Sequence, residues 1–212
     1  MPTSLPNILT ISRIAVIPVL VASFWLPGAW GDWFPLGLYI AACFTDWLVG
    51  FLARRFGQQS ELGRFLDPVA DKLLVAATIL MLVAFDRIDG WSILAAVVIL
   101  CREILVAGLR EFLAELRVMV PVARLAKWKT AVQMVAIGFL LAYDSARAWL
   151  NAPLIGEAGL WIAAILTLYT GYDYFLAALQ HFEPAATNPK ASGDGKAAAS
   201  TSPESGRKAT AA

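Results

Sequence analysis

The sequence predicts an all-α polytopic membrane protein, a bundle of six transmembrane helices with both termini on the cytoplasmic side. Its 212 residues are 59% hydrophobic, with a mean hydropathy of +0.66, which excludes an ordinary soluble domain. Long apolar runs alternate with short polar or Pro- and Gly-containing segments. The formal net charge is only +1, and we expect no nucleic-acid partner.

The apolar runs place the helices in order. The first follows Pro6 and ends near Pro27, and the tryptophans of the next turn are typical of a membrane–water interface. Pro68 suits the first turn of the third helix, where a missing N–H has no helical partner. The remaining five helices are expected over residues 35–56, 65–85, 91–116, 128–143 and 154–181.

Residues 1–182 therefore form the predicted membrane domain. Residues 183–212 are rich in Ala, Ser, Thr, Gly and Pro and have no apolar periodicity, so we expect a disordered tail.

The distribution of Lys and Arg sets the predicted orientation. With six spans, the loops on the side of the termini carry most of the basic residues, and the opposite loops carry only Arg87 and Arg147. By the positive-inside rule, the termini face the cytoplasm. The basic residues on the terminal side are Arg54, Arg55, Arg64, Arg110, Arg117, Arg124, Lys127 and Lys129.

Three carboxylates interrupt the apolar segments between residues 46 and 71. Asp46 lies in the second expected helix, and Asp67 and Asp71 lie one turn apart in the third. A charge at membrane depth costs about 2.5 to 3.5 kcal/mol on insertion scales and is usually functional. The link between the two helices is short, so they are expected to be antiparallel neighbours. We expect the three carboxylates to converge near one membrane surface, with Gly50 and Ala53 leaving space beside them.

Like charges in a low dielectric need either protonation or a cation. Oxygen ligands without His or Cys favour a hard ion, so the pattern predicts Mg²⁺ or Mn²⁺. The alternative is that the carboxylates only link helices by pairing with Arg54, Arg55 or Arg64. Those arginines are expected at the surface, and three carboxylates exceed what such a link needs.

A second charged group follows on the fourth expected helix. Glu103 is interpreted as a structural partner within the bundle, whereas Arg102 either pairs there or helps to hold an anionic substrate. Arg110, Lys127 and Lys129 lie nearer the cytoplasmic end. They would attract anionic headgroups, form a phosphate pocket beside the metal site, or do both.

The stretch from Asp46 to Asp71 resembles the signature of the CDP-alcohol phosphotransferases, D-x2-D-G-x2-A-R-x8-G-x3-D-x3-D. Seven of its eight fixed positions match, namely Asp46, Gly50, Ala53, Arg54, Gly63, Asp67 and Asp71. The segments PNILTISRIAVIPVL, FLDPVADKLLVA, CREILVAGLREFLAEL and LAKWKTAVQMVAIGFLL are similar to the bacterial members that make phosphatidylglycerophosphate. This similarity covers about residues 5–180.

The resemblance implies transfer of a phosphatidyl group from CDP-diacylglycerol to glycerol 3-phosphate, with release of CMP. It also implies a homodimer in the bacterial inner membrane with its active site facing the cytoplasm. Two metal ions would be held by Asp46, Asp67 and Asp71, and Asp71 would also act as the base on the acceptor hydroxyl. The nucleotide-binding positions it implies are Asp46, Gly50, Ala53, Arg54 and Gly63, and the acceptor-phosphate positions are Arg110, Lys127 and Lys129.

One position departs from the signature, because Val49 stands where the family has its second aspartate. Valine supplies no metal ligand, so we expect weaker metal binding and turnover reduced by orders of magnitude. The alternative is that water or the substrate diphosphate completes the coordination. Two other functions stay open: a different acceptor, such as inositol phosphate, serine or phosphatidylglycerol, and a non-catalytic protein that binds the lipid nucleotide.

Overall fold

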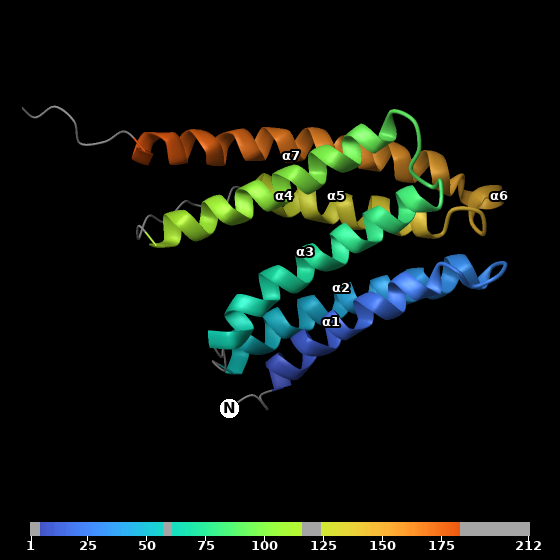
Figure 1. Cartoon of the computed structure of the whole chain (residues 1–212), viewed down its shortest axis with the longest axis horizontal. Coiled ribbons are helices and arrows are strands. Elements are labelled where there is room, and N and C mark those ends of the chain that lie inside the picture. Colours follow the sequence, from blue (N-terminus) through green and yellow to red (C-terminus); the bar gives the residue numbers. More distant parts are fainter. Residues whose placement is uncertain (1–4, 57–60, 116–123, 183–212) are drawn as a thin grey trace, which may run out of the picture.

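In the computed structural model, the described residues, 5–56, 61–115 and 124–182, form helices and connecting turns (Figure 1). The all-helical prediction is confirmed for this part of the chain. The tail 183–212 lies outside the described residues. The helices are α1 (Leu5–Ser23), α2 (Trp30–Phe56), α3 (Glu61–Ala84), α4 (Ser92–Glu115), α5 (Arg124–Leu141), the single-turn α6 (Arg147–Leu150) and α7 (Ala152–Phe182).

Several helix limits differ from those predicted. α3 begins at Glu61, so Pro68 lies inside it and not in its first turn. α2 begins at Trp30, so it includes Pro35, which was expected at its start. Because proline has no N–H, the carbonyl of Gly31 one turn earlier receives no helical hydrogen bond from it. Arg87 uses that carbonyl instead, with its Nη2 donating to the oxygen at 3.3 Å.

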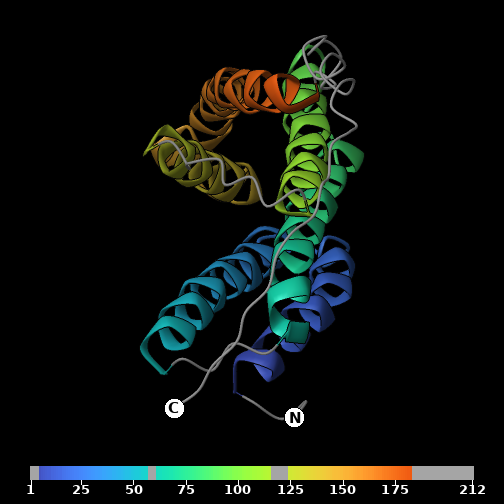
Figure 2. The same cartoon turned by 90° about the vertical axis from the view of Figure 1, so that its left-hand side faces the viewer.

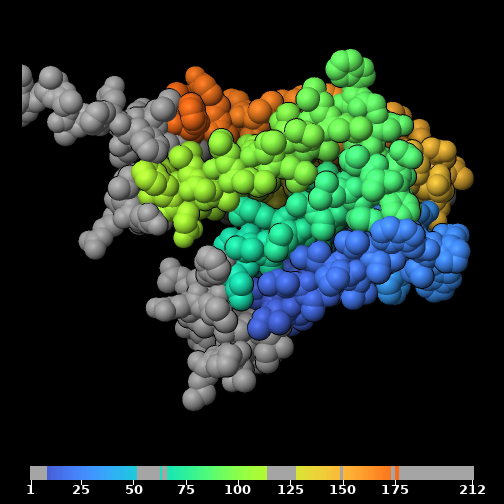
Figure 3. Space-filling model, viewed as in Figure 1, coloured from blue at the N-terminus to red at the C-terminus, as the bar shows by residue number. Residues whose placement is uncertain are grey.

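The helices pack in two groups that meet along α3 and where α2 contacts α5. α1 packs against α2 and α3, whereas α4 and α5 pack against α7. α3 contacts α4 and α5, and it lies between α1 and α4 on the face shown in Figure 3. The end view of Figure 2 shows the two groups on either side of this junction. The fully buried core therefore draws on nearly every long helix, with members such as Leu20, Leu82, Ile99, Ile137 and Leu160.

Small residues bring α5 and α7 together. A Cβ atom on Gly156 would lie 2.7 Å from Cγ of Leu140, and one on Gly159 would lie 2.9 Å from Cβ of Ala136. Real side chains do not tolerate such distances, so the absence of a side chain at both positions permits this approach. Close backbone contact through small residues is typical of helix pairs in membranes.

A hydrogen-bonded network joins three helix ends at the end of the molecule opposite to the aspartates. Arg87, in the turn between α3 and α4, places Nη2 2.6 Å from Oδ1 of Asp32. Its Nη1 donates to the carbonyl of Leu141 at the end of α5, at 2.7 Å. The backbone N–H and the hydroxyl of Ser145 donate to Oδ2 of Asp32 at 2.9 and 2.7 Å. The network thus ties the start of α2 to the ends of α3 and α5.

The apolar surface supports a membrane protein. Among the described residues, three helical segments are long and apolar enough to cross a bilayer: Trp30–Phe51, Ser92–Leu113 and Ala152–Tyr172. Leu9–Ser23 and Trp128–Leu141 are apolar but shorter. α3 has five charged residues among its first twelve, which explains why it is not among the apolar segments. Six membrane crossings therefore remain a prediction.

We predict that Arg87→Met lowers the free energy of unfolding by about 3 kcal/mol, because it leaves the buried Asp32 carboxylate without its cation. Chemical unfolding in detergent micelles, followed by circular dichroism, measures this change. Arg147→Met is the matched control, since Arg147 is 58% exposed and its Nη1 lies 3.8 Å from Asp144. That exposed pair should contribute less than about 1 kcal/mol. Equal effects of the two substitutions would contradict the prediction.

Candidate functional site

Asp46 on α2 is held by an arginine from the first helix. Its Oδ1 lies 2.9 Å from Nη1 of Arg13. The Arg13 side chain is only 1% exposed, whereas the Asp46 side chain is 41% exposed. Among the described residues, Nε and Nη2 of Arg13 have no hydrogen-bond partner. The guanidinium is therefore buried and only partly satisfied, while the carboxylate keeps an open side.

Asp67 on α3 is held by the same helix. The hydroxyl of Thr10, one turn before Arg13, donates a short hydrogen bond to Oδ1 of Asp67. Thr10 is fully buried. One face of α1 thus positions two signature aspartates from two other helices.

Neither Thr10 nor Arg13 was predicted from the sequence as a site residue. A signal was present, because Arg13 is the only charged residue in the apolar run of the first helix. An isolated charge in such a run is as informative as the aspartates themselves. The alternative partners considered for the carboxylates, Arg54, Arg55 and Arg64, have side chains outside the described residues. Asp46 instead pairs with Arg13.

Asp71 faces a different neighbourhood from the other two aspartates. It lines a pocket between α3, α4 and α5, together with Glu103, Thr130 and Gln133. We call this the Asp71 pocket. The negative charges of Asp46 and Glu103 both act on the Asp71 carboxylate, and the positive charge of Arg13 opposes them. Asp71 is therefore near both groups of charges without being bonded to either.

The three aspartates do not form a ready-made metal cluster in this arrangement. Within the described segments, no group of three or more His, Cys, Asp or Glu side chains is placed to hold a metal ion. Val49, one turn after Asp46, is 2% exposed and supplies no donor. The remaining donors are carboxylate oxygens, which fit a hard divalent ion. However, these carboxylates offer fewer ligand positions than a site for two ions uses. Arg13 also competes with a metal ion for the carboxylate of Asp46.

Of the other predicted nucleotide positions, Gly50 is half-buried and Gly63 is buried. The side chains of Ala53 and Arg54 lie outside the described residues. So does the side chain of Lys127, one of the three expected acceptor-phosphate residues. Arg110 is exposed on α4, and Lys129 is buried on α5. The structure thus does not bring these basic residues into one described cluster.

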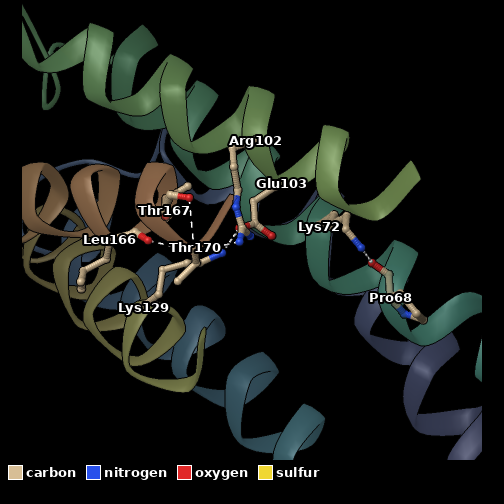
Figure 4. A network of polar contacts seen from close by, with 8 residues as sticks. All are labelled: Pro68, Lys72, Arg102, Glu103, Lys129, Leu166, Thr167 and Thr170. Atoms are coloured by element: carbon tan, nitrogen blue, oxygen red, sulfur yellow. Dashed lines mark hydrogen bonds and ion pairs between the residues drawn. The ribbon is translucent and has the colours of Figure 1, made fainter. Parts of the chain in front are cut away.

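Lys129 belongs to a polar network between α4, α5 and α7 (Figure 4). Its Nζ donates a short hydrogen bond to Oε1 of Glu103, and Nη1 of Arg102 lies 3.4 Å from the same oxygen. Nη2 of Arg102 donates to the hydroxyl of Thr170 at 2.8 Å. The expected structural pairing of Glu103 is confirmed, and Arg102, whose role was left open, takes part in it.

Gly171 makes room for this network. A Cβ atom at Gly171 would lie 3.1 Å from Cγ and 3.2 Å from Nε of Arg102. The Arg102 side chain therefore crosses directly over the α7 backbone to reach Thr170, one residue earlier. In this network, Lys129 and Arg102 both contact the carboxylate of Glu103.

Comparison with known proteins identifies the family. Residues 3–169 match the family model for CDP-alcohol phosphatidyltransferase. The chain belongs to this family. The resemblance inferred from the sequence signature is therefore confirmed.

Similar proteins cover nearly the same length. A protein from Rickettsia felis is 42% identical, over 84% of this chain and 97% of its own. One from Pseudomonas fluorescens is 42% identical, over 85% and 92% of the two chains. One from Cereibacter sphaeroides is 37% identical, over 85% and 97%. All three are named CDP-diacylglycerol–glycerol-3-phosphate 3-phosphatidyltransferase.

The unequal burial of Arg13 and Asp46 generates a prediction. Asp46→Asn should lower the free energy of unfolding by about 3 kcal/mol, because it leaves a buried guanidinium unpaired. Arg13→Met should cost about 1 kcal/mol or less, because the methionine fills the space and the half-open carboxylate is solvated. Chemical unfolding of the metal-free chain in detergent measures both. A larger loss for Arg13→Met would show that the carboxylate, and not the guanidinium, is the group that needs its partner.

Proposed function

We propose that this protein transfers a phosphatidyl group from CDP-diacylglycerol to glycerol 3-phosphate, giving phosphatidylglycerophosphate and CMP. The observation that carries the proposal is the family signature, with Asp71 opening into a pocket beside the Lys129 network. The names of relatives aligned over more than four-fifths of the chain agree with it.

We further propose six membrane crossings, with both termini and the aspartates on the cytoplasmic side of a bacterial inner membrane. The start of α1 and the end of α7 lie at the same end of the molecule in Figure 1, which supports an even number of crossings. The distribution of Lys and Arg supports the orientation. A homodimer is part of the same proposal and rests on the family resemblance.

In the proposed reaction, each group of residues has one task. The Asp71 carboxylate accepts the proton of the acceptor hydroxyl, which then attacks the phosphorus of the donor. Gly50, Ala53, Arg54 and Gly63 bind the nucleotide. Arg110, Lys127 and Lys129 bind the acceptor phosphate through charge-assisted hydrogen bonds.

The proposed cofactor is Mg²⁺ or Mn²⁺, held by Asp46, Asp67 and Asp71. When bound, such an ion supplies positive charge that offsets the negative charge of the diphosphate. Arg13 and Thr10 on α1 position the carboxylates of Asp46 and Asp67. The number of carboxylate oxygens that face the ion therefore depends on contacts with α1. Val49 removes a further ligand position, so we propose that turnover is strongly reduced in this chain.

A second candidate is a protein that binds CDP-diacylglycerol without turning it over. The buried Val49 and the engaged Asp46 favour it, because both reduce the number of free ligand oxygens. A different acceptor alcohol is a third candidate, and it keeps the same donor.

The deciding experiment compares this chain with its Val49→Asp variant. We predict that Val49→Asp raises CMP release from CDP-diacylglycerol and glycerol 3-phosphate by at least about tenfold, since even residues outside the first coordination shell of a metal site change activity by about 10- to 100-fold. The assay contains Mg²⁺ or Mn²⁺. Val49→Asn is the matched control, because it has the shape of aspartate without the charge, and it should stay near the level of the unaltered chain.

Equal turnover by the unaltered chain and Val49→Asp would mean that three carboxylates suffice. If neither chain releases CMP with this acceptor, serine, inositol phosphate and phosphatidylglycerol are tested in its place. Donor binding without CMP release by any of these chains would support the non-catalytic candidate.

A further inference from the structure

The Asp71 pocket contains a buried acceptor that the proposed chemistry does not use. Gln133 on α5 lines this pocket and is 4% exposed. Within the described part of the chain, its Oε1 has no hydrogen-bond partner. A buried amide oxygen without a donor is costly, so its position calls for a ligand that supplies one.

We propose that Gln133 accepts a hydrogen bond from a free hydroxyl of the acceptor and thereby makes the site specific for a polyol phosphate. This inference rests on the proposed function and names the residue that selects the acceptor. It goes beyond the signature residues, because Gln133 lies on α5, outside the Asp46–Asp71 stretch.

The polar groups around Gln133 support a ligand that brings hydrogen-bond donors. Ionised Asp71 and Glu103 only accept hydrogen bonds. Glu103 already receives Lys129 and Arg102. Both of those bonds go to Oε1 of Glu103. Lys72, the cation that also lines the pocket, donates to the carbonyl of Pro68 at 3.2 Å. Asp71, Gln133 and Oε2 of Glu103 are therefore acceptors that a ligand's hydroxyl groups would meet.

The spacing of these groups fits a three-carbon polyol phosphate. Gln133 follows Lys129 by four residues on α5, which puts both on one face, about 6 Å apart along the helix axis. Asp71, on α3, lines the same pocket as Gln133, whereas Lys129 lies beside the pocket and contacts its lining residue Glu103. A ligand with its phosphate toward Lys129 and two hydroxyls directs one to Asp71, which takes its proton. The other hydroxyl donates to Oε1 of Gln133.

This arrangement distinguishes glycerol 3-phosphate from an alkyl phosphate of the same length. n-Propyl phosphate has the same chain and phosphate but no hydroxyl, so it leaves Oε1 of Gln133 unpaired. The loss of hydrogen bonds to neutral groups is expected to weaken binding by about tenfold.

The test measures equilibrium binding of both compounds to the full chain in lipid nanodiscs by titration calorimetry. The unaltered chain should bind glycerol 3-phosphate about tenfold more tightly than n-propyl phosphate. Gln133→Leu should reduce this preference to the part that the hydroxyl facing Asp71 contributes, and should leave n-propyl phosphate binding unchanged. Gln133→Glu keeps an acceptor oxygen, so it should keep the preference while weakening both compounds through charge repulsion.

Thr167→Val is the matched control. Thr167 on α7 is another fully buried residue whose side-chain oxygen has no partner among the described residues, and it does not line the pocket. Its replacement should leave both affinities unchanged, and the melting temperature of each variant reports whether it is folded.

A Gln133→Leu variant that melts normally and keeps the full preference would overturn the inference and leave the proposed function intact. Equal binding of glycerol 3-phosphate and n-propyl phosphate by the unaltered chain would also overturn the inference and leave the proposed function intact. If Gln133→Leu does not fold, loss of the preference in Gln133→Glu overturns the inference, and its retention supports it. No binding of glycerol 3-phosphate to the unaltered chain would overturn the proposed function together with the inference.

Discussion

The need to pair every buried charge inside the protein governs this structure. Lipid offers no hydrogen bonds and little screening, so a charged side chain among apolar helices must find its partner on another helix. Within the described helices, such groups include Arg87 with Asp32, Glu103 with Lys129 and Arg102, and Arg13 with Asp46. Each joins parts of the chain that are distant in sequence. Apolar packing brings the helices together, and these pairs specify which helix faces which.

These interhelical ion pairs determine the distribution of charge around the candidate site. Arg13 pairs with Asp46, and Lys129 and Arg102 both contact Glu103. Asp71 is influenced by the charges of Asp46, Glu103 and Arg13 and, in the described part of the chain, has no ion pair with them. The paired carboxylates link helices, whereas Asp71 lines the pocket between α3, α4 and α5.

The sequence predicted much of this organisation and missed a definable part. Helix existence, the all-α class, the family and the structural role of Glu103 all followed from local patterns: apolar run length, signature spacing and burial of charge. Thr10 and Gln133 did not, because their importance depends on which groups of other helices lie around them, and no local pattern encodes that. The early start of α2 was missed for a similar reason. The carbonyl left free by Pro35 is used by Arg87, a partner from another part of the chain. Arg13 was missed although an isolated charge in an apolar run is a local signal.

The Arg13–Asp46 pair also constrains how the protein is made. α1 precedes α2 in the chain, so the guanidinium of Arg13 leaves the ribosome before the carboxylate of Asp46 does. A lone arginine in an apolar helix resists insertion, and the cost disappears only when Asp46 arrives. α1 and α2 should therefore enter the bilayer together as a helical hairpin. The arginine that positions the first aspartate in the finished protein would thus also set the order of membrane insertion.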